Sequence, residues 1–261
     1  MPRSEPSPAD DAGDRSQVGF VIAAGGSGTR FGGPVPKTRV NLNGKPVWRW
    51  SCDRIRRTFP GSPIVVVVPD GDEAYFTSDS DDVAATHAVD AWTIVAGGDS
   101  RAGSVRNGLD ALARLASVPQ WVAVHDAARA LVSAADLRSV VDAAALHGAA
   151  ILAAPVTSTV KRVSTHPDAA DPSRTVERIT ETIDRGSLRL AQTPQVARLD
   201  WLLDAFVRPA AAASTDEASA LEHAGYEVAV VPGSPLNFKI TTAADLLLAE
   251  ALCDRIDSEP A

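Results

Sequence analysis

The stretch VGFVIAAGGSGTR, Val18–Arg30, joins an almost continuous apolar run to a loop of glycines and small polar residues. An apolar run of this length that ends at glycines is typical of a strand buried on both faces. Glycines after the first strand of a doubly wound sheet let backbone amides approach a bound phosphate, although a tight turn would use the same residues. The stretch therefore predicts a buried first strand, followed by either a phosphate cradle or a structural turn.

Four more apolar runs follow, at residues 63–69, 91–97, 120–126 and 149–156. The segments between them have helical character. One carries Val105, Leu109 and Leu112 at helical spacing, and another, residues 134–149, ends in a His-Gly pair that suits a helix C-terminus. Such alternation predicts right-handed crossovers and an open, mainly parallel sheet with helices on both faces. The fold class is therefore α/β, with a doubly wound sheet.

The pattern changes after Val156, where two β-branched segments flank a loop-like stretch, HPDAADPS. These segments predict a protruding β-arm at about residues 157–185. Because a two-stranded ribbon cannot fold alone, we expect the arm to reach from the main sheet to a second subunit. Beyond it the sequence indicates helices near 198–207, at STDEASALEHAG and after Thr242, with strands around 226–231 and 236–240.

Composition sets the broad class of the protein. The 261 residues are 45% hydrophobic, which fits one large domain, placed at residues 18–257, with tails at 1–17 and 258–261. The first tail is rich in proline, serine and charge and is expected to be disordered. A net charge of −8 disfavours nucleic-acid binding, and no apolar run is long enough for a membrane span. The two cysteines lack metal or disulfide spacing, so we expect a cytoplasmic protein.

Polar residues gather where the predicted strands end. Arg30 and Lys37 follow the first strand and together could neutralise a triphosphate, although either one alone would be interpreted as a solvated surface charge. Gly97, Gly98, Arg101 and Ser104 follow the third strand. Since parallel strands end at the same edge of a sheet, these clusters predict one shared binding site.

Asp126 ends the fourth predicted strand. A carboxylate there suits Mg²⁺, which takes one or two protein carboxylates together with phosphate oxygens and waters. A helix cap, or an ion pair with Arg129, would explain the same residue equally well. The neighbouring His125 has no metal-type spacing and is expected to be structural. Lys239 lies in an apolar run and needs a partner, which a phosphate would provide.

Seven segments follow one another along the chain: VIAAGGSGTRF with its following PK, GGDSRAGSVRNGL, VHDAAR, APVTSTVK, DRGSLRLAQTPQ, TDEASALE and NFKIT. In this order they resemble the 2-C-methyl-D-erythritol 4-phosphate cytidylyltransferases of the non-mevalonate isoprenoid pathway. The resemblance implies a Rossmann-like nucleotidyltransferase fold with a β-arm. The resemblance extends from about Val18 to Leu252. The glycine loop is shared with many sugar nucleotidyltransferases, whereas the blocks around DAAR, QTPQ and TDEAS together are specific to far fewer families.

The resemblance implies CTP and methylerythritol phosphate as substrates, Mg²⁺ as cofactor, and a homodimer formed through the β-arm. It implies that Arg30, Lys37 and Lys239 act on the CTP phosphates, and that Asp126 binds the metal. The remaining CTP contacts would come from Ala24, Gly25, Gly26, Gly28, Gly98 and Ser104. The methylerythritol phosphate site would be formed by Thr159, Arg185, Thr193 and Thr215, some of them reached across the dimer.

Three positions depart from the family pattern. Ala130 replaces a common proline, and Ser158 replaces an aspartate that often precedes the threonine of the arm motif. Many members carry an aspartate just before the Asn-x-Lys segment, whereas Ser234–Leu236 offers no carboxylate here. Two alternatives therefore stay open, a ribitol 5-phosphate cytidylyltransferase and a non-catalytic nucleotide-binding dimer. Retention of both Lys37 and Lys239 argues against the second.

Overall fold

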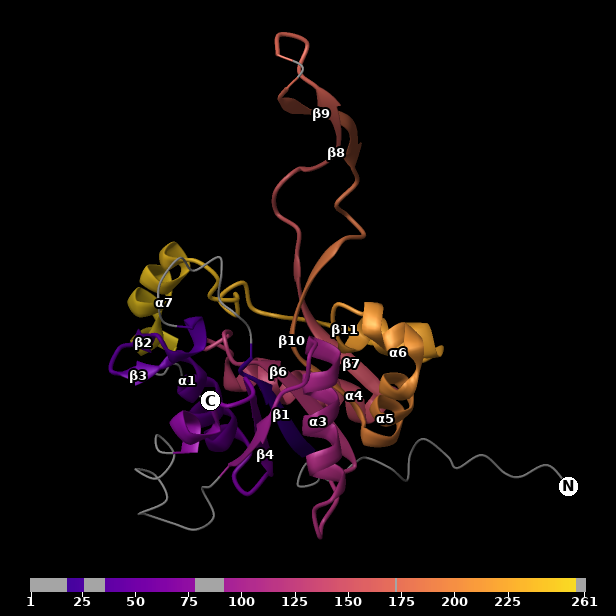
Figure 1. Ribbon diagram of the computed structural model, residues 1–261. Coiled ribbons are helices and arrows are strands. Elements are labelled where there is room, and N and C mark those ends of the chain that lie inside the picture. Colours follow the sequence, from indigo (N-terminus) through magenta and orange to yellow (C-terminus); the bar gives the residue numbers. More distant parts are fainter. Residues whose placement is uncertain (1–17, 26–35, 78–91, 172, 257–261) are drawn as a thin grey trace, which may run out of the picture.

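A seven-stranded sheet with helices on both faces forms the body of the protein (Figure 1). The computed structural model describes residues 18–25, 36–77, 92–171 and 173–256, and the side chains of Lys37 and of residues 254–256 are outside this description. Both predicted tails lie outside it as well. The strand order is β11-β7-β10-β6-β1-β4-β5. Their bounds are β1 Val18–Ala23, β4 Ile64–Val68, β5 Thr93–Ala96, β6 Trp121–Asp126, β7 Ala149–Pro155, β10 Arg189–Arg198 and β11 Ala229–Pro232.

All five predicted apolar strands are present and point the same way. β1 pairs in parallel with β4 and β6, and β4 pairs in parallel with β5. β10 runs antiparallel between β6 and β7, so the sheet is mixed at its centre. The sequence prediction missed β10 because its residues, RLAQTPQVAR, do not form the continuous apolar run by which the other strands were found.

The strand predicted around 236–240 is wrong. β11 accounts for the first of the two late strands, whereas residues 236–240 belong to no strand. Their backbone bonds to loops instead: Asn237 N donates to Ser234 O at 3.0 Å and Ile240 N donates to Ala128 O at 2.8 Å. Asn237 and Ile240 are nevertheless fully or almost fully buried, so the apolar pattern reflected burial and not a sheet.

Two hydrophobic cores cover the two faces of the sheet. On one face α1 and α4 pack through side chains such as Trp48, Ile55 and Leu137. On the other face α3, α5 and α6 pack through Leu109, Leu202 and neighbouring residues. The helices are α1 Val47–Thr58, α3 Arg101–Ala113, α4 Ala134–His147, α5 Leu199–Val207, α6 Glu217–Ala224 and α7 Ala243–Ile256, with short 3₁₀ turns η3 Lys37–Arg39 and η4 Pro209–Ala213.

Helix α3 packs against the sheet at Gly108, where there is no room for a side chain. A Cβ at Gly108 would lie 2.6 Å from Cγ1 of Val21 in β1 and 2.9 Å from Cγ2 of Val67 in β4. Any side chain there would push the helix away from the strands. Gly108 therefore lets the middle of α3 pack directly against β1 and β4.

The predicted β-hairpin is present as β8 Val160–Pro167 and β9 Thr175–Ile183, which pair antiparallel. It projects away from the sheet at the top of Figure 1. The hairpin is continuous with the sheet, since Pro155 of β7 pairs with Arg189 of β10. A separate small pair is formed by β2 Asn41–Leu42 and β3 Lys45–Pro46. Among the described helices, none is long and apolar enough to cross a bilayer.

Candidate active site

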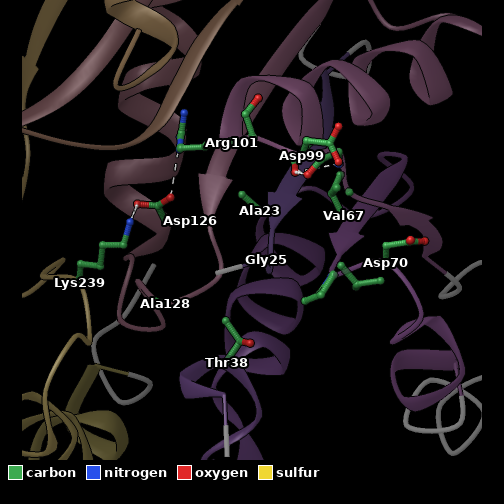
Figure 2. Close-up of a pocket in the computed structure, with 16 residues that line it drawn as sticks. Ala23, Gly25, Thr38, Val67, Asp70, Asp99, Arg101, Asp126, Ala128 and Lys239 are labelled. Atoms are coloured by element: carbon green, nitrogen blue, oxygen red, sulfur yellow. Dashed lines mark hydrogen bonds and ion pairs between the residues drawn. The ribbon is translucent and has the colours of Figure 1, made fainter. Parts of the chain in front are cut away.

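The carboxyl ends of β1, β4, β5 and β6 surround a cavity of about 490 Å³ (Figure 2). Five of the residues expected to bind CTP or its phosphates line it, namely Gly25, Gly98, Ser104, Asp126 and Lys239. Further polar residues lie there that the sequence analysis did not assign to CTP, among them Thr38, Asp70, Asp99 and Arg101. Ala24 is buried and does not line the cavity, and its N–H donates a hydrogen bond to Val67 O at 2.8 Å. The strand ends thus converge on one site.

The glycine loop can be followed only at its two ends. Gly25 is its last described residue, and Gly26, Gly28 and Arg30 lie outside the described residues. The chain is described again from Pro36, and Lys37 begins η3. Beside Lys37, the Thr38 hydroxyl donates to Ala24 O at 3.2 Å, which ties the start of η3 to the end of β1. The two ends of the loop therefore meet at the cavity.

The turn after β5 is packed against the first turn of α3. Ser104 Oγ accepts a hydrogen bond from Gly98 N at 3.1 Å, and Ser100 caps the helix by accepting from Gly103 N at 3.0 Å. A Cβ at Gly97 would lie 2.8 Å from Ser104 Oγ and 3.0 Å from Val68 O. Only glycine fits this turn, so the glycines at this strand end also have a packing reason to be there.

Asp126 lies among three cations at the end of β6. Lys239 Nζ is 2.7 Å from Oδ2, Arg129 Nε is 3.7 Å from Oδ2 and Arg101 Nη2 is 3.8 Å from Oδ1. Figure 2 shows the carboxylate between Lys239 and Arg101. Burial by itself would raise the pKa of Asp126, but the charges of Lys239 and Arg101, with Arg129, hold that pKa at about 2. The carboxylate is therefore ionised at every physiological pH.

The backbone under Asp126 is fixed by β10. Asp126 N donates to Thr193 Oγ1 at 3.0 Å, and Thr193 Oγ1 lies 3.1 Å from His125 Nδ1. His125 is completely buried, and its Nε2 lies 3.3 Å from Arg129 O. Burial lowers the pKa of His125 to about 4, so the ring is neutral at pH 7. Its position agrees with the structural role expected for it.

Arg101 links the cavity to helix α6. Its guanidinium is bound by both carboxylate oxygens of Glu217, with Nη1–Oε1 at 2.7 Å and Nη2–Oε2 at 3.1 Å. The Glu217 side chain is 1% exposed, whereas that of Arg101 is 33% exposed. Burial raises the pKa of Glu217, and the Arg101 charge opposes that rise. The sequence analysis placed Arg101 at a strand end and Glu217 in the TDEAS block, but no spacing rule indicates that the two would pair.

Lys239 is carried by a loop with side-chain anchors. Asn237 Nδ2 donates to Thr193 O at 2.9 Å, and Gln192 Nε2 donates to Ser234 O at 2.9 Å. Arg129 Nη1 donates to Asn237 O at 2.7 Å. These bonds hold the irregular segment against β10. The segment therefore positions the ammonium group of Lys239 at the cavity although it is not a strand. Arg129 therefore stabilises the loop as well as the Asp126 charge.

The four residues expected at the polyol phosphate do not line this cavity. Thr159 and Arg185 are exposed at the base of the hairpin, where Arg185 Nη1 donates to Thr157 O. Thr215 is exposed just before α6, and its N–H donates to Ser219 Oγ at 3.1 Å. Thr193 is buried under Asp126. Within the described part of one chain these residues are separate, and their substrate role stays a prediction.

A doubly wound sheet that gathers glycine turns, a lysine and an ionised carboxylate at its strand ends defines a nucleotide-binding α/β protein. The sequence profile of the family described as 2-C-methyl-D-erythritol 4-phosphate cytidylyltransferase (IspD) matches residues 18–255. A curated relative of that name from Rhodopirellula baltica is 37% identical over 252 residues, which are 94% of this chain and 98% of the relative. The chain belongs to this family.

Other relatives support the same assignment. A bifunctional IspD/IspF enzyme from Anaeromyxobacter dehalogenans is 43% identical over 236 residues, which cover 90% of this chain and 56% of that longer protein. Among solved structures, a 4-diphosphocytidyl-2C-methyl-D-erythritol synthase superposes with a TM-score of 0.71 at 28% identity, covering 91% of this chain and 98% of the other. The enzyme from Thermus thermophilus superposes with a TM-score of 0.68 at 28% identity, covering 91% and 99%. The expected α/β fold and the family resemblance are confirmed.

Proposed function

We infer that the protein transfers the cytidylyl group of CTP to 2-C-methyl-D-erythritol 4-phosphate and releases pyrophosphate, as a step of isoprenoid precursor synthesis. Family membership over nearly the whole chain supports this activity. The structural observation that carries it is the ionised Asp126 paired with Lys239 in the cavity at the strand ends. Neither a ribitol 5-phosphate cytidylyltransferase nor a non-catalytic dimer is favoured by the family match.

The reaction is an in-line displacement at the α-phosphorus of CTP. An oxygen of the methylerythritol phosphate attacks that phosphorus, a new P–O bond forms, and the bond to the β-phosphate oxygen breaks as pyrophosphate leaves. The attacking phosphate is already ionised at neutral pH, so no general base is needed. Catalysis then depends on positioning and on stabilising negative charge, which are the dominant contributions in phosphoryl-type transfer.

The chain's own residues supply that positioning and charge. Gly98 and Ser104, with the backbone at Ala24 and Gly25, Gly26 and Gly28, would hold the nucleotide. Lys239 would keep its contact with Asp126 Oδ2 and donate another N–H to an α-phosphate oxygen, while Arg30 and Lys37 would bind the remaining phosphates. The anchors of the Lys239 loop keep this ammonium in place, so little reorganisation is needed when charge develops.

Mg²⁺ would be held jointly by Asp126 and the bound nucleotide. No group of three or more His, Cys, Asp or Glu side chains in the described residues could hold a metal. One ionised carboxylate that opens on a cavity still suits Mg²⁺, because triphosphate oxygens and waters can complete its octahedron. When bound, Mg²⁺ would neutralise charge on the phosphates. Asp126 would hold it, with no second carboxylate from Ser234–Leu236.

The second substrate needs residues that the cavity of one chain does not include. We propose that Thr159 and Arg185 reach it from the hairpin of a partner subunit in a homodimer, and that Thr215 and Thr193 complete the site from the chain that holds CTP. The exposure of the hairpin base supports this arrangement. We further propose a cytoplasmic location, with small molecules and its own copy as partners, and with neither nucleic acid nor membrane.

The test is pyrophosphate release from CTP with each of two acceptors. We expect turnover with methylerythritol phosphate and at least about a hundredfold less with ribitol 5-phosphate, since a site that hydrogen-bonds its substrate rejects mismatched polyols strongly. ATP, GTP and UTP in place of CTP are the controls for the nucleotide. Equal rates with the two acceptors, or no release with either, would contradict the proposed function.

A further inference from the structure

The two oxygens of the Asp126 carboxylate differ in their surroundings. Oδ2 accepts a hydrogen bond from Lys239 Nζ at 2.7 Å and also has Arg129 Nε at 3.7 Å. Oδ1 has Arg101 Nη2 at 3.8 Å, which is beyond hydrogen-bond distance. Among the described residues no hydrogen bond reaches Oδ1. This oxygen is the part of the carboxylate that is open to a ligand in the cavity.

Arg101 is close enough to close off Oδ1 but is held by another carboxylate. A movement of about 1 Å would bring its guanidinium to a charge-assisted hydrogen-bond distance of about 2.8 Å. Both terminal nitrogens instead bond to Glu217, at 2.7 and 3.1 Å. A bidentate pair of this kind fixes the plane of the guanidinium as well as its position.

Glu217 is itself firmly placed. It is the first residue of α6, whose N-cap Asp216 forms a capping box with Ser219. Gln195 of β10 clamps this helix start, since its Oε1 accepts from Ala218 N at 2.8 Å and its Nε2 donates to Asp216 Oδ2 at 2.9 Å. Glu217 is fully buried, so it cannot swing away into solvent. The helix start therefore presents a fixed acceptor to Arg101.

We propose that Glu217 is a positioning residue that holds Arg101 away from Asp126 and so keeps Oδ1 available to the divalent cation of the bound nucleotide. The proposal rests on the function proposed above. Without the Glu217 charge, Arg101 would turn to the other carboxylate within reach and compete with the cation. Because α6 begins directly after Thr215 and Asp216, the same contact connects the metal side of the site to the side expected to hold the polyol phosphate.

The experiment compares the affinity of CTP in excess Mg²⁺ with its affinity in EDTA, by calorimetric titration without an acceptor. The ratio of the two affinities reports the metal contribution and involves no turnover. We expect Glu217→Gln to lower this ratio about tenfold, which is the equivalent of one hydrogen bond to a charged group. The affinity for CTP in EDTA should change little. Glu222→Gln, an exposed substitution on the same helix, is the matched control and should keep the wild-type ratio.

A second variant separates positioning from a general structural effect. Arg101→Met combined with Glu217→Gln removes the competing cation together with its partner and leaves no unpaired buried charge. Its ratio should equal or exceed that of the wild type, and melting curves check that each variant is folded. A ratio in Glu217→Gln equal to the wild type, or a low ratio that persists in the double variant, would overturn the inference. A wild-type ratio of one would overturn the metal site of the proposed function, and the inference with it.

Discussion

The cavity and the hairpin satisfy their charges in different ways. At the cavity Asp126 lies among Lys239, Arg101 and Arg129, and the Arg101 partner Glu217 is completely buried. On the hairpin the pair Arg162–Glu181 joins side chains that are 66% and 57% exposed. The hairpin also leaves the cross-strand neighbours Val163 and Ile179 exposed, at 44% and 64%.

The difference shows which region is complete within one chain. The charges at the cavity are paired with one another, and the carboxylates of Asp126 and Glu217 are buried, so these two groups cannot relax into water. Exposed ion pairs contribute little, and an exposed apolar pair on a two-stranded ribbon has no core behind it. The cavity therefore takes its geometry from its own fold, whereas the described part of one chain provides no core for the apolar pair on the hairpin.

The strongest test of the cavity side is Asp126→Asn. We expect turnover to fall by at least about a thousandfold, because the variant loses the charge that would hold the metal. Circular dichroism and a melting curve should show a folded protein, and Asp53→Asn, which breaks the separate Lys45–Asp53 pair, is the matched control with near-normal turnover. A folded Asp126→Asn protein that keeps its rate but melts much earlier would show that Asp126 is only a structural partner of Arg129.

Lys37→Ala tests the glycine loop, whose far end meets the cavity at η3. We expect turnover to fall about a hundred- to a thousandfold with the fold unchanged, since a preorganised charge at a phosphate is lost. Lys45→Ala, a lysine outside the cavity, is the control. Steady-state turnover that is equal in both variants would exclude Lys37 from the phosphate site.

Removal of residues 159–183 tests the hairpin side. Because β7 and β10 are neighbouring antiparallel strands, a short turn can join them without disturbing the sheet. We expect a monomer in sedimentation that still binds CTP but turns over methylerythritol phosphate at least about a hundredfold more slowly, since positioning of the acceptor is lost. A fully active monomer would mean that the hairpin contributes nothing to the second site.

The last prediction concerns stability and not turnover, at the buried His125 beneath Asp126. The pKa of His125 is lowered to about 4 in the folded protein, against an ordinary value of 6.5. Above about pH 6.5 the ring is neutral in both states; as the pH falls towards 4, only the unfolded chain takes up the proton. The free energy of unfolding should therefore drop by about 3 kcal/mol over this range.

Urea unfolding between pH 7 and 4 would measure this drop. A His125→Gln variant should show a flatter dependence, whereas His166→Gln on the exposed hairpin should follow the wild type. If the three proteins had the same profile, the buried ring would not be the group that senses acid.

The predictable parts of the fold were those with a strong local pattern. The run VGFVIA and its four counterparts became strands because burial on both faces demands continuous apolar residues. The helix end at Gly148 and the helix start at Thr242, where Thr242 and Asp245 bond to each other's backbone N–H, follow from backbone chemistry that a few residues determine. β10 was missed, and residues 236–240 were wrongly assigned to a strand, because pairing partners far along the chain decided both.

The same limit applies to the site. Gly25, Gly98, Ser104 and Asp126 could be placed at one edge because strand ends in a parallel sheet share that edge. Lys239 reaches Asp126 through loop hydrogen bonds from Gln192 and Asn237, and no periodicity encodes such a route. The sequence indicated no role for Glu217 beyond its place in the TDEAS block. Its bond to Arg101 joins two helix starts that are 116 residues apart in the chain.

The place of β10 in the centre of the sheet has a consequence for the order of folding. β1, β4, β5 and β6 can pair as soon as residue 126 has left the ribosome, which leaves β6 as an open edge strand. β10 fills that edge only after about 60 further residues, including the whole hairpin, have been made, and such distant contacts form late. Thr193 and Gln195 arrive with β10, and they bring the bonds that orient Asp126 and clamp the start of α6. The cavity is therefore among the last parts of the protein to mature, and the nascent chain carries its nucleotide-facing strands well before it can use them.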